Sequence, residues 1–225
     1  MLTIADDLLL LVLDDESGRS SLDGSTLDAA VGGGLLLELA LAERVDVEES
    51  GRLLRQKLVR VVDAAPFDDP VLDSALGTVA ERSRTPQDLV SRLGKELRPR
   101  LLDRLVERGI LRREENRVLG LFPQTRWPAE DSEHEDAVRQ RLRDVLVTGL
   151  ASDERTSALV ALLRALDRAH TVLPDLDREQ RRTARSRAKA VADGAWAADA
   201  VRSSVQAMQT AVLTATTAAA VTTST

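Results

Sequence analysis

The 225-residue sequence contains no cysteine and no tyrosine, and aromatic residues make up only 2% of it. Without cysteine the chain has no disulfide bonds, no thiolate metal sites and no cysteine nucleophiles, which argues against redox chemistry. The shortage of aromatic side chains leaves almost no stacking platforms for nucleic-acid bases. Hydrophobic residues still make up 43% of the chain, so the core must be built from Leu, Val and Ala.

Positive charge is also in short supply, since 37 acidic residues outnumber 31 basic ones and give a net charge of −6. A protein that binds nucleic acids without sequence preference needs a positive field to release counterions, so this charge argues against that class. Arginine outnumbers lysine by 28 to 3, a bias that indicates a bacterial source with a GC-rich genome.

Long apolar runs are missing as well, because no stretch reaches the about 20 apolar residues that a membrane-spanning helix needs. The run from Leu8 to Leu13 follows Asp6 and Asp7 instead of basic residues, so it lacks the features of a secretory signal. We therefore expect a cytoplasmic protein that touches membranes at most as a peripheral protein.

The most apolar segment spans residues 29–42, where Glu38 is the only residue that is neither apolar nor glycine. A helix there has almost no face for water and must be buried on nearly all sides. It would be ~21 Å long against the ~30 Å core of a bilayer, so protein should cover it. We predict a mainly α-helical single domain around a buried central helix over about 25–44, with small β-hairpins.

Capping signals mark the neighbouring helices. Thr3 with Asp6 predicts a capping box, Pro70 predicts a helix start, and Asp153 predicts the N-cap of a later helix. We predict that a helix from Pro86 stops at Gly94 and that a separate helix follows. The glycines 32–34 lack the Gly-Lys-Ser/Thr of a phosphate loop, so we expect them to allow close helix packing.

Alternating segments at 45–49 and 57–63 predict one hairpin, and residues 110–122 predict a second hairpin with its tip at 115–116. An exposed loop over 123–128 should follow it. Residues 1–200 are expected to form the helical domain. Residues 201–225 are expected to form an Ala/Thr-rich C-terminal helix and frayed tail.

Signals for catalysis and metal binding are weak. The two histidines, His134 and His170, are not spaced as metal ligands on one helix. Paired acids such as Asp6 and Asp7 lie at expected helix ends, where the helix dipole and solvent account for them. We therefore expect no catalytic residue, no metal site, no cofactor and no enzymatic activity.

Basic residues gather in two places despite the acidic total. The first cluster comprises Lys95, Arg98, Arg100 and Arg104, and the second comprises Arg178, Arg181, Arg182, Arg185, Arg187 and Lys189. Each fits either a solvated helix face with acidic neighbours or an anion site. Trp127, between Arg126 and Pro128, fits either a core anchor or a membrane interface.

Four ordered segments resemble the Golgi phosphoprotein 3 family: LTIADDLLLLVLDDESGRSSL, GGGLLLELALAERVDVE, DDPVLDSAL and RPRLLDRLVERGILRREENRVLGLFPQTRWP. The resemblance spans about residues 2–200. It implies a mostly helical domain with a buried central helix and a projecting hairpin. It also implies a non-enzymatic peripheral membrane adaptor, because eukaryotic members bind phosphatidylinositol 4-phosphate on Golgi membranes and retain glycosyltransferases there.

The resemblance also implies a head-group site. The family's pocket uses two basic residues near the start of the helix before the hairpin, and these match Lys95 and Arg98. It also uses a Trp before the central helix and an Arg ahead of the apolar run. Those positions fall at about Leu22 or Asp23 and at Gly32. Two of the four side chains that form the head-group site in the family are therefore missing here.

A lipid phosphate needs several converging donors, so we expect Arg19 or Arg126 to lie beside Arg98 in place of the missing arginine. The family's membrane-facing hairpin loop is implied to retain Phe122 and Trp127 as membrane contacts. The expected partners are an anionic phospholipid surface and a protein client, and the sequence indicates no oligomeric state.

The alternative is a winged-helix-like nucleic-acid-binding regulator. A helix that ends at Gly109 and is followed by a hairpin is typical of that unit. Its phosphate contacts would be Arg98, Arg100, Arg104 and Arg108.

Overall fold

The computed structural model describes residues 2–50, 56–118, 122–194, 207 and 209–214. These residues are mainly helical, with two small antiparallel sheets of two strands each, which confirms the predicted fold class. In chain order the elements are α1 (Ile4–Val12), α2 (Gly24–Leu41), β1 (Val45–Ser50), β2 (Gln56–Val61), α3 (Pro70–Ala80), α4 (Pro86–Glu107), β3 (Glu114–Val118), β4 (Phe122–Arg126), α5 (Glu133–Arg143), η1 (Asp144–Thr148, a π-helical turn), α6 (Glu154–Ala165) and α7 (Arg178–Ala192).

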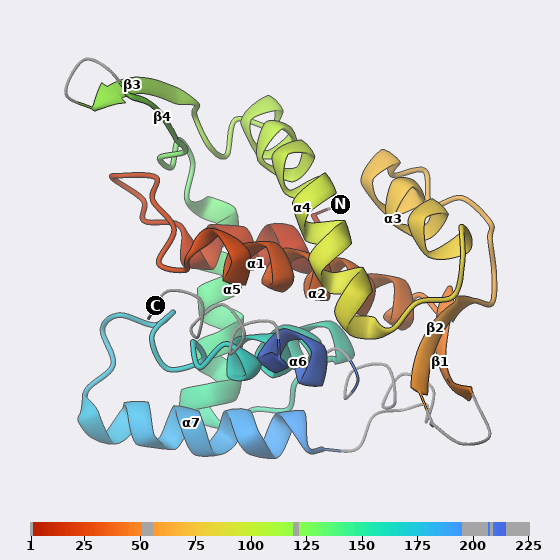
Figure 1. Cartoon of the computed structure of the whole chain (residues 1–225). Helices are drawn as coiled ribbons and strands as arrows, with labels where there is room; N and C mark the ends of the chain where they lie inside the picture. The colour runs from red at the N-terminus through yellow and green to blue at the C-terminus, as the bar shows by residue number, and fades with distance from the viewer. Residues whose placement is uncertain (1, 51–55, 119–121, 195–206, 208, 215–225) are drawn as a thin grey trace, which may run out of the picture.

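The predicted central helix is α2, which packs against α1, α4 and α6 (Figure 1). It begins after Asp23, whose side chain accepts hydrogen bonds from the Ser25 and Thr26 backbone, each at 3.0 Å. In the described part of the chain, α2 alone has the length and composition to cross a membrane, but 72% of it is buried inside the protein. It therefore serves as the core helix of the fold.

Glycines set the distance between α2 and α4. A Cβ on Gly32 would overlap the Val90 carbonyl of α4, and a Cβ on Gly94 of α4 would overlap the Asp28 carbonyl of α2. The two backbones therefore touch at both points, and the close packing predicted for the glycines of α2 is confirmed at Gly32. This contact fixes α4 along α2 and brings Arg98 to the N-terminal turn of α2.

The predicted break at Gly94 is wrong, because α4 runs without interruption from Pro86 to Glu107 and includes Pro99. Gly94 serves the contact with Asp28 and does not end the helix. Pro99 removes one N–H donor from the helix interior. Tertiary packing offsets that loss, since Leu97 and Leu101, on either side of Pro99, are buried in the core.

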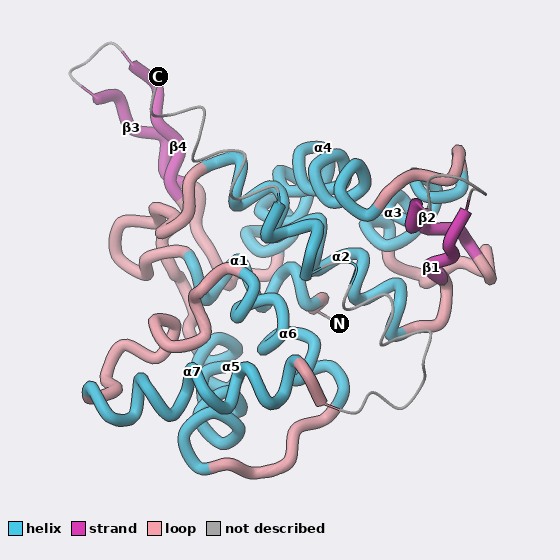
Figure 2. Tube along the Cα trace, turned by 60° about the horizontal axis from the view of Figure 1, so that its bottom comes forward, coloured by secondary structure: helices cyan, strands magenta, loops and turns pink. Residues whose placement is uncertain are grey.

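The two hairpins lie at opposite ends of the helical body (Figures 1 and 2). In the second hairpin Glu115 pairs with Thr125 and Val118 with Phe122. The predicted tip at 115–116 is therefore wrong, because the connecting residues are 119–121, which lie outside the described residues. The loop predicted over 123–128 is strand β4 as far as Arg126.

The start of α1 holds a buried ionic network. The Thr3–Asp6 capping box is present, as predicted. However, Asp6 and Asp7 are buried, so the helix dipole and solvent do not account for them. Asp6 pairs with Arg104 of α4, while Asp7 lies 2.7 Å from His134 of α5 and 3.1 Å from Arg155 of α6. Polar side-chain contacts thus join α1 to three other helices.

The C-terminal segment predicted over 201–225 lies mostly outside the described residues. Within it, residues 209–214 are helical, and Ala211 and Val212 are buried in the core. The division of the chain at residue 200 stays a prediction.

Candidate functional site

A cavity of about 490 Å³ lies between the α1–α2 loop, the start of α2, the middle of α4 and the base of the second hairpin. We call it the Arg19–Arg98 cavity, because these two arginines are its charged lining residues and no described carboxylate lines it. Leu9, Leu27 and Leu102 form part of its apolar wall. The cavity thus combines an apolar surface with two guanidinium groups.

The α1–α2 loop is held on the base of the hairpin by backbone hydrogen bonds. The Asp15 carbonyl accepts from the Ala129 N–H at 2.9 Å, and the Gly18 carbonyl accepts from the Trp127 N–H at 3.3 Å. Gly18 has a φ of +59°, and a Cβ there would overlap the Trp127 backbone, so glycine is required. These contacts place Arg19 and Trp127 in the wall of one cavity.

Arg98 is held by the first turns of α2. Its Nη1 donates to the Gly24 carbonyl at 3.0 Å and lies 2.7 Å from Oδ1 of Asp28. Burial raises the pKa of Asp28, while the charges of Arg98 and Lys95 act against that rise. Asp28 therefore pairs with the guanidinium group that Arg98 brings to the cavity wall.

The structure brings together only some of the predicted head-group residues. Arg19 and Arg98 line one cavity, whereas Lys95 is exposed one turn earlier on α4 and does not line it. Arg126 is half-buried and also does not line it, because Thr125 and Trp127 take the positions that face the cavity. Lipid binding by these four residues stays a prediction.

The remaining predicted positions have structural roles or fall outside the description. Trp127 packs against the core as well as lining the cavity, and the side chain of Phe122 lies outside the described residues. Their contact with a membrane stays a prediction. Asp23, at the family's Trp position, caps α2, and Gly32, at the family's Arg position, lies at the α2–α4 contact.

Sequence reasoning did not identify Asp28. Seventy positions separate Arg98 from Asp28, so no helical spacing or local motif signals their ion pair. Ser20 and Thr125, which add hydroxyl groups to the cavity wall, were missed for the same reason.

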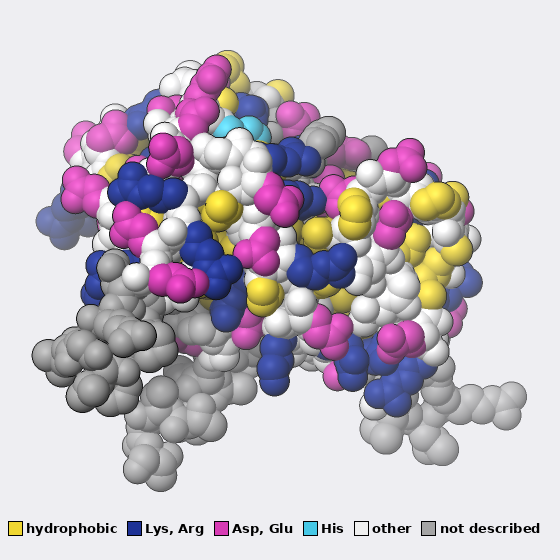
Figure 3. Space-filling model, turned by 90° about the horizontal axis from the view of Figure 1, so that it is seen from above, with side chains coloured by type: hydrophobic (Ala, Val, Ile, Leu, Met, Phe, Trp, Pro, Cys, Tyr) yellow, Lys and Arg dark blue, Asp and Glu magenta, His cyan; other side chains and the backbone are white. Residues whose placement is uncertain are grey.

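The face shown in Figure 3 mixes Lys and Arg with Asp and Glu, and apolar side chains lie between them. No broad patch of one sign dominates this face, in keeping with the net charge of −6. Among the described residues no group of three or more His, Cys, Asp or Glu is arranged to hold a metal ion.

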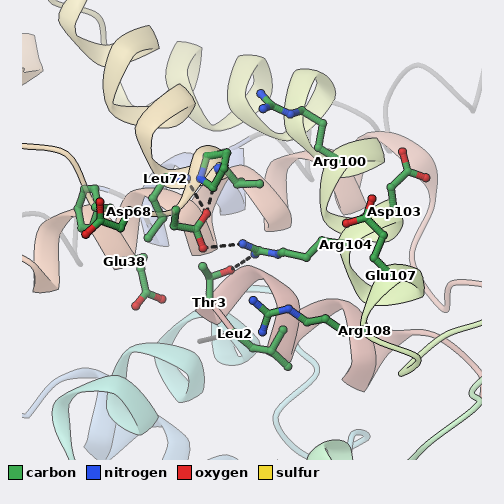
Figure 4. A pocket seen from close by; sticks show the side chains of 14 residues that line it. Leu2, Thr3, Glu38, Asp68, Leu72, Arg100, Asp103, Arg104, Glu107 and Arg108 are labelled. Atoms are coloured by element: carbon green, nitrogen blue, oxygen red, sulfur yellow. Dashed lines mark hydrogen bonds and ion pairs between the residues drawn. The ribbon is translucent and has the colours of Figure 1, made fainter.

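A larger cavity of about 740 Å³ lies between α3, α4 and the start of α1, and its lining carries charges of both signs (Figure 4). Arg104 points across it to Thr3 and Asp69, with the Asp69 carboxylate at 2.8 Å. Arg100 donates to the Ser74 hydroxyl at 2.9 Å. These arginines bind their own protein, so the structure does not favour the nucleic-acid alternative.

The sequence profile of the family described as Golgi phosphoprotein 3 (GPP34) matches residues 4–208. Vacuolar protein sorting-associated protein 74 of Eremothecium gossypii is 27% identical to the chain over 222 residues. That alignment covers 84% of this chain and 66% of the relative, so the chain spans slightly less than two thirds of the relative's length.

Proposed function

Because this chain belongs to the Golgi phosphoprotein 3 family, we propose that it is a peripheral membrane adaptor that binds an anionic phospholipid head group in the Arg19–Arg98 cavity. The adaptor acts from the cytoplasmic side, performs no catalysis and holds a protein client at the membrane. Phosphatidylinositol 4-phosphate is the lipid that the family resemblance implies.

One observation carries the proposal: Arg19 and Arg98 come from distant parts of the chain and line the same cavity. Arginine presents a planar fork of donors that fits phosphate, and two forks provide several converging hydrogen bonds. Trp127 adds an aromatic side chain to the wall, of a kind favoured where an apolar region meets water.

The surface charge shapes the expected binding. The net charge of −6 repels anionic membranes, so attraction has to come from a local site and not from the whole surface. Each basic residue near an anionic membrane contributes about 1 kcal/mol. Two such residues support weak binding that decreases as salt is added.

Vesicle flotation tests the proposal. Wild-type protein is expected to float with phosphatidylcholine vesicles that contain phosphatidylinositol 4-phosphate at low salt, and not with phosphatidylcholine alone. Arg98→Glu should weaken binding by about 2 kcal/mol, since it removes one attraction and adds one repulsion of about 1 kcal/mol each. Arg19→Glu should act in the same direction.

Arg92→Glu is the matched control. Arg92 lies on the same helix and is exposed, pairs with Glu96 at 3.1 Å and does not line the cavity. The Arg92→Glu variant makes the same change in net charge as Arg98→Glu but should weaken binding to vesicles much less. Equal binding by wild type and a folded Arg98→Glu variant, with folding checked by circular dichroism, would show that the proposed site is wrong.

A further inference from the structure

A separate cavity of about 380 Å³ lies where the C-terminal end of α6 meets α7. We call it the α6–α7 cavity. These two helices pack side by side in Figures 1 and 2. The polar lining residues of the α6–α7 cavity are Arg164, Asp167, His170, Arg185 and Lys189. This cavity shares no lining residue with the Arg19–Arg98 cavity.

His170 supplies a buried donor in this wall. The residue is 9% exposed, and its Nε2 lies 2.8 Å from Nη2 of Arg185. A guanidinium only donates, so Nε2 accepts and the neutral ring carries its proton on Nδ1. Among the described residues Nδ1 has no hydrogen-bond partner. A buried N–H without an acceptor is unfavourable, so this atom is suited to a ligand oxygen.

The Asp167 carboxylate marks where such an oxygen would lie. Oδ1 is 3.7 Å from Nδ1 of His170, and Oδ2 is 3.7 Å from Nη2 of Arg185. Both distances are beyond hydrogen-bond range. The Asp167 side chain is 80% exposed, so it is free to turn toward solvent when another anion arrives.

Two other cations of the cavity are not used elsewhere. Arg164 is half-buried and Lys189 is exposed, and the side chain of neither has a hydrogen-bond or ion-pair partner among the residues that the structure describes. Other arginines of the basic cluster on α7 serve the fold instead. For example, Arg181 donates to the carbonyls of Leu176 and Pro174 at 2.9 and 2.7 Å.

The protonation of His170 agrees with a cationic cavity. Burial lowers the pKa of His170, and the charges of Arg185, Arg181 and Arg168 lower it further, while Asp167 acts in the opposite direction. The ring is therefore neutral at neutral pH and keeps one N–H to donate.

We propose that the α6–α7 cavity binds a phosphate-type dianion, which accepts hydrogen bonds from Nδ1–H of His170 and from Arg185, with Arg164 and Lys189 adding charge. Three cations and Asp167 give the lining a net charge of about +2, which matches the charge of −1.5 to about −2 on a phosphate monoester at pH 7. The phosphate belongs either to a soluble phosphorylated molecule or to a lipid head group.

The chain has only two histidines, so the NMR signals of the imidazole rings give a direct test. Inorganic phosphate is added at constant ionic strength, with sodium chloride as the reference salt. The His170 signals should shift and saturate, and the pKa of His170 should rise because a bound anion favours the imidazolium form. His134 lies on α5, contacts Asp7 of α1 and does not line the α6–α7 cavity, so its signals should stay in place.

Arg164→Gln should weaken phosphate binding about tenfold, because it removes one of the three positive charges that attract the anion. The matched control is Arg182→Gln, because Arg182 is exposed on α7, outside the cavity lining, and its loss changes the net charge equally. A His170 shift that grows without saturating, or equal affinity in wild type and Arg164→Gln, would overturn the proposal.

The same variant distinguishes the two sources of phosphate once saturable binding is seen. If the ligand is soluble, Arg164→Gln binds phosphate more weakly and still floats with phosphatidic acid vesicles as well as wild type does. If the ligand is a head group, flotation with those vesicles falls along with phosphate binding. Arg98→Glu should leave the His170 titration unchanged, because Arg98 lines the other cavity.

Discussion

Asp28 forms an ion pair with Arg98 across the contact between α2 and α4, with 2.7 Å between Oδ1 and Nη1. A lipid phosphate bound in the Arg19–Arg98 cavity would need the same guanidinium group of Arg98. Asp28 would therefore compete with the proposed ligand, because it already neutralises the charge of Arg98.

The variant Asp28→Asn should bind anionic vesicles more tightly than wild type. Removing the opposing charge beside Arg98 is worth about 1 kcal/mol for a pair in contact with water, or about fivefold in affinity. Flotation or surface plasmon resonance on vesicles with phosphatidylinositol 4-phosphate measures the affinity of Asp28→Asn relative to wild type. Glu96→Gln is the control, since it also removes one negative charge, but Glu96 pairs with Arg92 and not with Arg98. Equal gains in both variants would contradict direct competition.

Gly94→Ala should lower the free energy of unfolding by about 2 kcal/mol or more, because the added methyl group overlaps the Asp28 carbonyl. The control is Gly77→Ala on α3, where nothing lies within 4 Å of the new Cβ. That change should raise stability by about 0.5 to 1 kcal/mol, since alanine favours a helix interior. Urea unfolding measures the free energy of unfolding of both variants. An unchanged stability of Gly94→Ala would refute the backbone contact.

Arg155→Leu should destabilise the protein strongly. Arg155 lies 3.1 Å from buried Asp7 and 2.7 Å from Glu38, so its loss leaves Glu38 without its cation and Asp7 with His134 alone. Removing one partner from a buried ion pair costs about 3 to 5 kcal/mol. Arg143→Leu breaks an exposed pair with Asp175 and should cost about 0 to 1 kcal/mol. Thermal and urea unfolding measure the loss of stability in each variant. Similar losses in Arg155→Leu and Arg143→Leu would contradict the expected difference between a buried and an exposed ion pair.

Glu135 gives the protein a defined pH dependence. Its side chain is buried beside Arg139, 2.6 Å away. Burial raises the pKa of Glu135 to about 7, Arg139 opposes the rise, and the charges of Asp15 and Asp136 add to it. The folded protein thus holds this proton more tightly than the unfolded chain, where the pKa is 4.5. Stability should therefore fall as pH rises from 4.5 to about 7, and no further above that.

Glu135→Gln isolates this contribution, because glutamine stays neutral throughout. Wild type should lose on the order of 3 kcal/mol relative to the variant as pH rises through that range. Urea unfolding at several pH values gives the difference. Parallel stability profiles for the two proteins would mean that Glu135 titrates normally.

Local signals predicted much of the fold. The Thr3–Asp6 box, the start at Pro70 and the cap at Asp153 depend on residues a few positions apart, and all three are present. Gly94 misled the prediction, because a glycine that ends a helix and one that allows two helices to touch look alike in sequence. Only the position of Asp28 across the contact distinguishes them.

The candidate site was less accessible to sequence reasoning. Arg98 was named through the family resemblance, and Arg19 was one of two options for the missing donor. The choice between Arg19 and Arg126 depends on how the α1–α2 loop lies on the hairpin and on which strand residues face the cavity. Neither feature has a sequence period or a motif. The pairing of Asp28 with Arg98 was hidden for the same reason.

The contact of Gly32 with Val90 also limits how this protein can evolve. Relatives are implied to carry an arginine at this position, but here any side chain would push α4 away from α2. Arg98 lies two turns further along α4, so that displacement would also move it away from its cavity. A single substitution at position 32 therefore cannot add the arginine that the resemblance implies for the family, and tighter binding of the proposed ligand would have to come from changes elsewhere, such as at position 28.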